Sequence, residues 1–153
     1  MPYLPTLCDH CSRPRLVPIA DVTDGAARCP DCNGEARIVP SRSYPAADLD
    51  LFDELSEGVS SGMSAATAQQ LAARVGHILW SGSSTSAFND LMERWPGLFT
   101  LQTAIGGNAQ AQRRVLQLLS TIFAALAMLR PGMPVSSHDQ EERSEPRTVA
   151  PSR

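Results

Sequence analysis

The sequence contains no lysine, and all 13 of its basic residues are arginine, against 16 acidic residues and a net charge of −3. An arginine-only basic set together with abundant alanine is typical of a GC-rich genome. Proteins that bind nucleic acid generally carry a basic excess, which neutralises phosphate groups. The charge balance therefore disfavours a general nucleic-acid binder.

Long apolar runs and aromatic residues are also scarce. Aromatic residues make up 5% of the chain, and its most apolar stretch covers residues 115–129. A helix needs roughly 20 apolar residues to cross a bilayer, so this stretch is too short. The N-terminal sequence "MPYLPTLCDH" lacks the basic start and apolar run of a signal peptide. We expect a cytoplasmic protein with no membrane segment.

Cysteine occurs at only four positions, in two tight pairs, "CDHC" at residues 8–11 and "CPDC" at residues 29–32. Without a secretory signal, such pairs indicate a reducing compartment and metal binding rather than disulfides. Each CxxC turn brings two thiolates to one face of a tetrahedral ion, and a hairpin of two short strands fits between the pairs. The sequence predicts one Zn²⁺ bound by Cys8, Cys11, Cys29 and Cys32.

Four cysteine ligands close the coordination shell, whereas catalytic zinc keeps a position open for water. We therefore expect a structural metal, which supplies stability that a module of about 40 residues lacks on its own. Rubredoxin-type iron uses the same four thiolates and stays open as an alternative. Aromatic residues usually surround such iron sites, and this region has only Tyr3 and Tyr44.

Residues 3–42 resemble the zinc ribbon family through "CDHC" and "CPDCNG". In that family a glycine after the second cysteine lets backbone N–H groups approach the sulfur. Here Gly34 follows Cys32 by two positions, and the first pair is followed by "SRPR", which has no glycine. Ribbons occur in transcription factors, ribosomal proteins and enzymes, so the resemblance does not choose a function.

The predicted fold class is α+β, with a small N-terminal β zinc ribbon (1–44), a mainly α-helical bundle of about five helices (45–130) and a disordered tail (131–153). In the ribbon, residues 15–22 and 27–29 form a hairpin around an Asp24-Gly25 turn, and residues 36–40 add a third strand. Pro18 places the first of these strands at an edge.

Apolar residues at helical spacing predict the helices of the second region. Ser64, Ser86 and Asn108 are expected to cap three of them, and residues 81–86 are expected to form a flexible break. The last helix, 109–129, is apolar almost all round, which indicates a central core helix. If the other helices fail to cover it, the same helix, taken as 109–130, would form a homodimer.

Polar and aromatic residues outside the cysteines give weaker signals. His10 and the two aspartates of the cysteine turns, Asp9 and Asp31, are expected to be exposed to solvent, and His77 is expected to have an ordinary helix-surface or packing role rather than a catalytic one. The acidic face of one predicted helix is also expected to be exposed to solvent. An aromatic pair beside a Pro-Gly corner is expected to fill the core. That acidic face consists of Asp48, Asp50, Asp53, Glu54 and Glu57, and the aromatic pair is Trp95 and Phe99.

The sequence contains no Ser/His/Asp or Cys/His set with a free nucleophile, because the metal takes every cysteine. We therefore expect a non-enzymatic adaptor or regulatory protein that acts through protein–protein contacts, with a partner of unknown identity. One alternative is a transcription- or RNA-associated ribbon that contacts nucleic acid through Arg13, Arg15, Arg28, Arg37 and Arg42. A second alternative is an accessory subunit of a larger enzyme or assembly.

Overall fold

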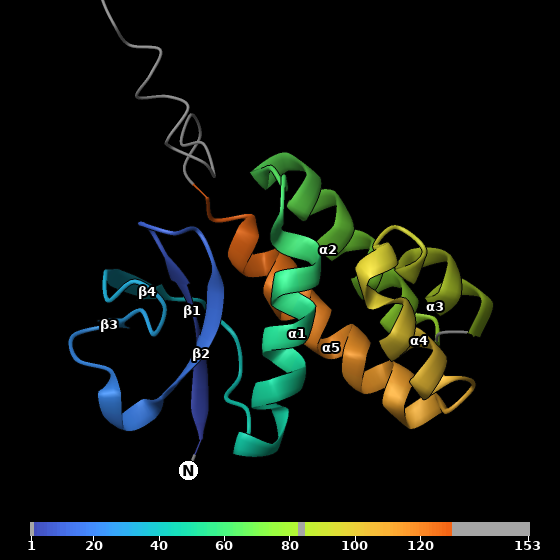
Figure 1. Cartoon of the computed structure of the whole chain (residues 1–153), viewed down its shortest axis with the longest axis horizontal. Helices are drawn as coiled ribbons and strands as arrows, with labels where there is room; N and C mark the ends of the chain where they lie inside the picture. Colours follow the sequence, from blue (N-terminus) through green and yellow to red (C-terminus); the bar gives the residue numbers. More distant parts are fainter. Residues whose placement is uncertain (1, 83–84, 130–153) are drawn as a thin grey trace, which may run out of the picture.

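A computed structural model describes residues 2–82 and 85–129 of the chain. Over these residues an antiparallel sheet of four strands is followed by five α-helices, as Figure 1 shows. The predicted α+β class is confirmed. The tail predicted for residues 131–153 lies outside the described residues, as does the middle of the segment 81–86.

The sheet consists of β1 (Tyr3–Cys8), β2 (Pro14–Pro18), β3 (Ala26–Arg28) and β4 (Glu35–Ile38), in the order β2-β1-β4-β3. β2 is an edge strand, as Pro18 predicts, but it ends at that residue, and a 3-10 turn (Ile19–Asp21) replaces the rest of the predicted strand. The Asp24-Gly25 turn is present, with φ angles of 53° and 78°.

The predicted pairing of the strands was wrong. Strand β1 was not among the predicted strands, and Pro5 lies inside it. The proline is tolerated because β1 pairs with β4 only over Thr6–Cys8, while the carbonyl of Pro5 accepts a hydrogen bond from the Val39 N–H at 2.9 Å. β1 pairs with β2, and β3 pairs with β4. Each cysteine pair therefore lies in the turn of its own hairpin.

The helices are α1 (Leu49–Ser60), α2 (Ala65–Trp80), α3 (Thr85–Met92), α4 (Phe99–Ile105) and α5 (Ala109–Leu126). Ser64 and Asn108 cap α2 and α5 as predicted, since their side chains accept hydrogen bonds from backbone N–H groups three residues later. Ser86 lies inside α3 rather than capping it, and α5 ends three residues earlier than expected.

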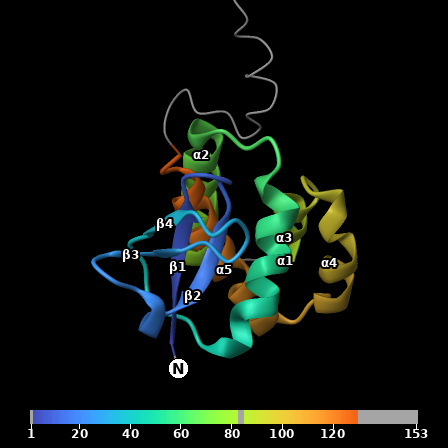
Figure 2. The same cartoon turned by 60° about the vertical axis from the view of Figure 1, so that its left-hand side comes forward.

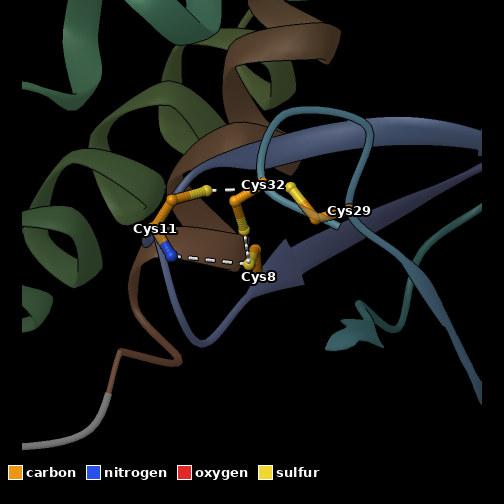
Figure 3. Close-up of side chains that lie close together, drawn as sticks. All are labelled: Cys8, Cys11, Cys29 and Cys32. Carbon is orange, nitrogen blue, oxygen red and sulfur yellow. Dashed lines mark hydrogen bonds between the residues drawn. The ribbon is translucent and has the colours of Figure 1, made fainter. Parts of the chain in front are cut away.

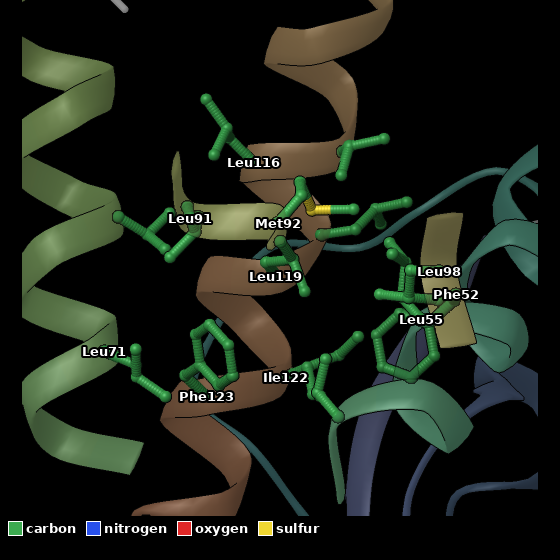
Figure 4. Close-up of a cluster of buried hydrophobic side chains, with 14 of the residues drawn as sticks. Phe52, Leu55, Leu71, Leu91, Met92, Leu98, Leu116, Leu119, Ile122 and Phe123 are labelled. Carbon is green, nitrogen blue, oxygen red and sulfur yellow. The ribbon is translucent and has the colours of Figure 1, made fainter. Parts of the chain in front are cut away.

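Helix α5 runs through the centre of the helical layer (Figure 1). Its fully buried side chains contact those of α1, α2 and α3, and Figure 4 shows this cluster. Trp95 belongs to it, with its ring centroid 5.6 Å from that of Phe123, but Phe99 is 66% exposed and does not fill the core as expected. Helix α5 is covered within its own chain, so its apolar surface does not by itself support a homodimer. The homodimer stays a prediction.

Helix α1 approaches the segment before α4 closely at Gly58. A Cβ atom at this position would lie 2.6 Å from the Leu98 side chain, which is too close for a non-bonded carbon–carbon contact. Glycine lowers helix propensity, so its presence in the middle of α1 has a packing reason. The missing side chain lets Leu98 reach the core, where it is almost completely buried.

The sheet packs on the helical layer, β2 against α1 and β1 against α5, as the turned view in Figure 2 shows. Leu16 and Tyr44 join the core of the helices, and Leu7 packs on Ala125 of α5. At the junction the buried Ser56 hydroxyl donates to the carbonyl of Pro14 at 3.0 Å. Among the described residues, none of the helices combines the length and apolar character needed to cross a membrane.

Candidate metal centre

The two cysteine turns are built alike. In the first, the Ser12 N–H donates to the Cys8 carbonyl at 2.9 Å, and in the second the Asn33 N–H donates to the Cys29 carbonyl at 2.8 Å. Ser12 and Asn33 both take left-handed backbone conformations, with φ of 58° and 64°. Two turns of the same shape at the ends of neighbouring hairpins bring the four sulfur atoms together (Figure 3).

All four sulfur atoms lie within 4.8 Å of one another. Across the two turns, the sulfur of Cys8 is 3.4 Å from that of Cys32, and the sulfur of Cys11 is 3.7 Å from that of Cys29. Four sulfurs about 2.3 Å from one tetrahedral ion lie about 3.8 Å apart, whereas a disulfide requires about 2.05 Å. The four thiols are free, and their spacing fits one metal ion.

Backbone N–H groups point at three of these sulfur atoms, with N···S distances of 3.3–3.4 Å. Hydrogen bonds of this kind favour the thiolate over the thiol and so prepare a sulfur for a cation. The donors are His10 and Cys11 to Cys8, Asp31 to Cys29, and Gly34 to Cys32. The Gly34 N–H thus performs the role that the resemblance implied.

The thiols differ in acidity because their surroundings differ. The Gly34 N–H lowers the pKa of Cys32 to about 6. Burial raises the pKa of Cys8, and burial together with the neighbouring Cys29 thiol raises the pKa of Cys11. Four thiolates close together repel one another, so a cation is what allows all of them to ionise.

Gly34 also provides space beside the sulfur atoms. A Cβ atom on it would lie 3.3 Å from the Cys32 sulfur and 3.2 Å from the Cβ of His10. Both contacts are tighter than ordinary van der Waals packing, so a larger residue would require His10 or the Cys32 sulfur to shift by a few tenths of an ångström. His10 itself is exposed, as expected, and lies outside the group of metal-binding side chains.

Asp9 and Asp31, the aspartates inside the two CxxC pairs, are not simply solvated as the sequence analysis expected. The Asp31 carboxylate accepts a hydrogen bond from the Arg15 Nε at 2.8 Å. Asp9 binds Arg37, whose Nε lies 3.0 and 3.1 Å from the two carboxylate oxygens. Both arginines therefore neutralise charge beside the sulfur cluster.

Arg15 is the more deeply placed of these arginines, with 7% of its side chain exposed. Its guanidinium also lies 3.4 Å from the Asp53 carboxylate and 3.5 Å from that of Glu57, both on α1. Burial acts to lower the Arg15 pKa, but the hydrogen bond that Arg15 donates to Asp31 and the charges of the three carboxylates raise it overall. The acidic face of α1 is thus partly paired rather than wholly solvated.

The remaining charged residues of the acidic face divide between pairing and exposure. Asp48 is largely buried and accepts a hydrogen bond from the Arg114 Nε at 2.7 Å, which corrects the expectation that it is solvated. Asp50 and Glu54 are exposed, as is His77 on α2. The pairings of these carboxylates with Arg15 and Arg114 join residues that are far apart in sequence, so no local sequence pattern predicts them.

A groove of about 830 Å³ lies between β2, the second cysteine turn and α1. Arg15 and Arg28 line it, together with four residues that carry carboxylates, Asp21, Asp31, Asp53 and Glu57. Apolar side chains form the remaining wall, among them Val17, Pro18 and Leu49. Comparisons with protein-family models, with curated proteins and with solved structures found no match for the chain.

Proposed function

We propose that the chain is a cytoplasmic, non-enzymatic adaptor or regulatory protein, in which Cys8, Cys11, Cys29 and Cys32 hold one structural Zn²⁺. The observation that carries this proposal is the sulfur cluster, in which four thiols from two equivalent turns lie within 4.8 Å of one another. The arrangement resembles a zinc ribbon in having a CxxC pair in each of two hairpin turns.

The donor set supports zinc with a stabilising role. Four sulfur ligands complete a tetrahedral shell, and a complete shell provides no position for water or substrate. Iron can occupy the same four thiolates, so metal identity is decided by elemental analysis of protein purified under reducing conditions. We expect one equivalent of zinc. Iron in its place, or no metal, would contradict the zinc assignment.

A role in protein contacts is supported by the groove beside the metal centre. Its carboxylates outnumber its two arginines, and its apolar wall offers surface that a partner residue would cover. A groove that is both acidic and partly apolar fits a protein segment with a basic side chain beside an apolar one. The proposed adaptor therefore binds a basic segment of a partner protein.

The nucleic-acid alternative receives less support from the arginines near the sheet. Arg15 and Arg37 bind carboxylates, Arg28 donates to the Asn33 carbonyl, and Arg42 donates to Gln117. Guanidinium groups engaged in this way are not arrayed to neutralise phosphates. We expect no binding of a fluorescent oligonucleotide at low salt, and salt-sensitive binding would instead favour this alternative.

Partner binding is tested by affinity capture from the native host, with three baits compared by mass spectrometry. The wild-type chain is compared with Asp21→Asn/Glu57→Gln, which removes two groove charges, and with Asp50→Asn/Glu54→Gln, which removes two exposed charges of α1 outside the groove. We expect proteins captured by the wild type and by the second variant to be lost with the first. Equal capture by all three baits would contradict the groove as the contact surface.

A further inference from the structure

The aspartates of the two cysteine turns hold arginines that also contact the helical layer. Arg15 joins Asp31 of the second turn, at 2.8 Å, to Asp53 and Glu57 of α1, at 3.4 and 3.5 Å. Arg37 joins Asp9 of the first turn, at 2.9 Å, to the carbonyl of Met128 just beyond the end of α5, at 3.2 Å. Each turn is thus connected to a different helix through one arginine.

Asp31 makes the connection between sulfur and helix direct. Its backbone N–H lies 3.4 Å from the Cys29 sulfur, while its carboxylate accepts the Arg15 hydrogen bond. The conformation that aims this N–H at a metal-binding sulfur is therefore the conformation that presents the carboxylate to Arg15. A bound cation, by fixing the sulfur positions, also fixes the carboxylate.

Because Arg15 is buried, the loss of its contact with Asp31 would be energetically costly. Its side chain is only 7% exposed, whereas the side chains of Asp31, Asp53 and Glu57 are 36%, 48% and 62% exposed. A buried cation that loses a partner is costly, because water does not replace the lost hydrogen bond. If the second turn relaxes, Arg15 loses its shortest contact, and its position between the sheet and α1 becomes unfavourable.

The second bridge acts at a helix end. Met128 lies two residues beyond Leu126, the last residue of α5, at the helix end where backbone carbonyls lack helical partners and a positive charge is favourable. Arg37 supplies that charge, and Asp9 orients the guanidinium through two short contacts with its Nε. The first cysteine turn therefore influences where the end of α5 is held.

We propose that metal binding at the four cysteines is energetically coupled to the seating of α1 and of the end of α5 on the sheet, through the Asp31–Arg15 and Asp9–Arg37 bridges. This inference rests on the metal-binding part of the proposed function and is independent of its partner. Because α1 forms one wall of the groove, metal occupancy also controls the shape of the groove.

The main experiment measures hydrogen exchange of the full chain with Zn²⁺ bound and after its removal by a chelator. Removal should raise amide exchange in the cysteine turns, in α1 and at the end of α5, and less in α2, which contacts neither bridge. Unchanged exchange in α1 and at the end of α5 after removal would overturn the coupling. This measurement uses the wild-type protein and needs no variant to fold.

Coupling is reciprocal, so changes on α1 must alter Zn²⁺ affinity. In competition with a chromophoric chelator, Asp53→Asn/Glu57→Gln should bind Zn²⁺ about five-fold or more weakly than wild type. The matched control, Asp50→Asn/Glu54→Gln, removes the same charge from exposed positions of the same helix and should keep wild-type affinity. Equal weakening by both variants would reduce the effect to long-range electrostatics and overturn the proposal.

The second bridge is tested with Arg37→Gln, which should weaken Zn²⁺ binding and raise amide exchange at residues 124–128. Arg13→Gln removes the same charge from an exposed position in the first turn, and it should leave both quantities unchanged. Equal effects of the two variants would overturn this bridge. A wild-type chain that binds no Zn²⁺ refutes the proposed function as well, whereas Zn²⁺ binding without an exchange change refutes only the coupling.

Discussion

The sheet and the helical layer are held together by different physics. The helices share one large apolar core around α5, in which Leu116, Leu119, Ile122 and Phe123 are completely buried. The cysteine end of the sheet buries a cluster of Cys8, Cys29 and Ala36, with two further cysteines packed against it. The helical layer needs no ligand to bury its side chains. The cysteine end of the sheet is instead organised around four sulfur atoms that one cation would hold together.

The comparison teaches that a small sheet of this kind takes its stability from two outside sources. One is the metal, which in small zinc peptides contributes on the order of 10 kcal/mol. The other is the helical layer, which covers Leu7, Leu16 and Tyr44. Perturbing the sheet, the helices and their junction separately shows how much each source supplies.

The largest effect is expected from Cys29→Ser, which removes one sulfur ligand. The variant should lose its metal and, with it, the fold of residues 3–42, because the metal contribution is on the order of 10 kcal/mol. The helices should keep most of their circular dichroism signal, since their core is largely their own. Elemental analysis and far-ultraviolet spectra check this, and complete loss of helical signal would mean that both regions unfold as one unit.

The reverse experiment is Phe123→Ala, in the centre of the helical core. Phe123 is completely buried and packs on Trp95, so its truncation should lower the free energy of unfolding by about 3–5 kcal/mol. Urea unfolding of the metal-bound protein measures this loss, and the zinc content should stay at one equivalent. Loss of zinc from this variant would contradict the separation of the two regions.

An intermediate effect is expected at the junction from Ser56→Ala. The Ser56 hydroxyl is buried and donates to the Pro14 carbonyl at 3.0 Å, so the variant leaves this carbonyl without that donor. An unsatisfied buried acceptor costs about 1–3 kcal/mol in the free energy of unfolding. As a control, the exposed Ser61→Ala should change stability very little. If both variants lost the same free energy of unfolding, the hydrogen bond between Ser56 and Pro14 would not stabilise the junction.

The smallest effect concerns the pH dependence of stability. Burial raises the pKa of Asp53 above 3.8, although the Arg15 charge acts to lower it. Just above pH 3.8 the Asp53 carboxyl is therefore protonated to a greater extent in the folded chain than in the unfolded chain. The stabilising contribution of Asp53 falls as pH rises through its folded pKa. The unfolding free energy of wild type minus that of Asp53→Asn should decline over this window, and an increase would contradict the assignment.

Local patterns were sufficient to predict much of this architecture. Ser64 and Asn108 cap their helices because a side-chain oxygen reaches a backbone N–H three residues along, which depends only on neighbouring residues. The CxxC spacing likewise predicts two local turns, but the two pairs meet only because β1 pairs with β4, which the predicted hairpin did not include. Strand β1 was not predicted. Its pairing with β4 joins residues far apart in sequence, which local propensity does not show.

The sequence by itself determined the α+β class, the helical periodicity and the two CxxC turns, because each follows from interactions between residues close along the chain. Only the tertiary structure decided that Asp31 and Asp9 hold Arg15 and Arg37, and that these arginines reach α1 and Met128. Those pairings depend on how the sheet packs against the helices. The charges involved look like ordinary solvated residues until the fold brings them together.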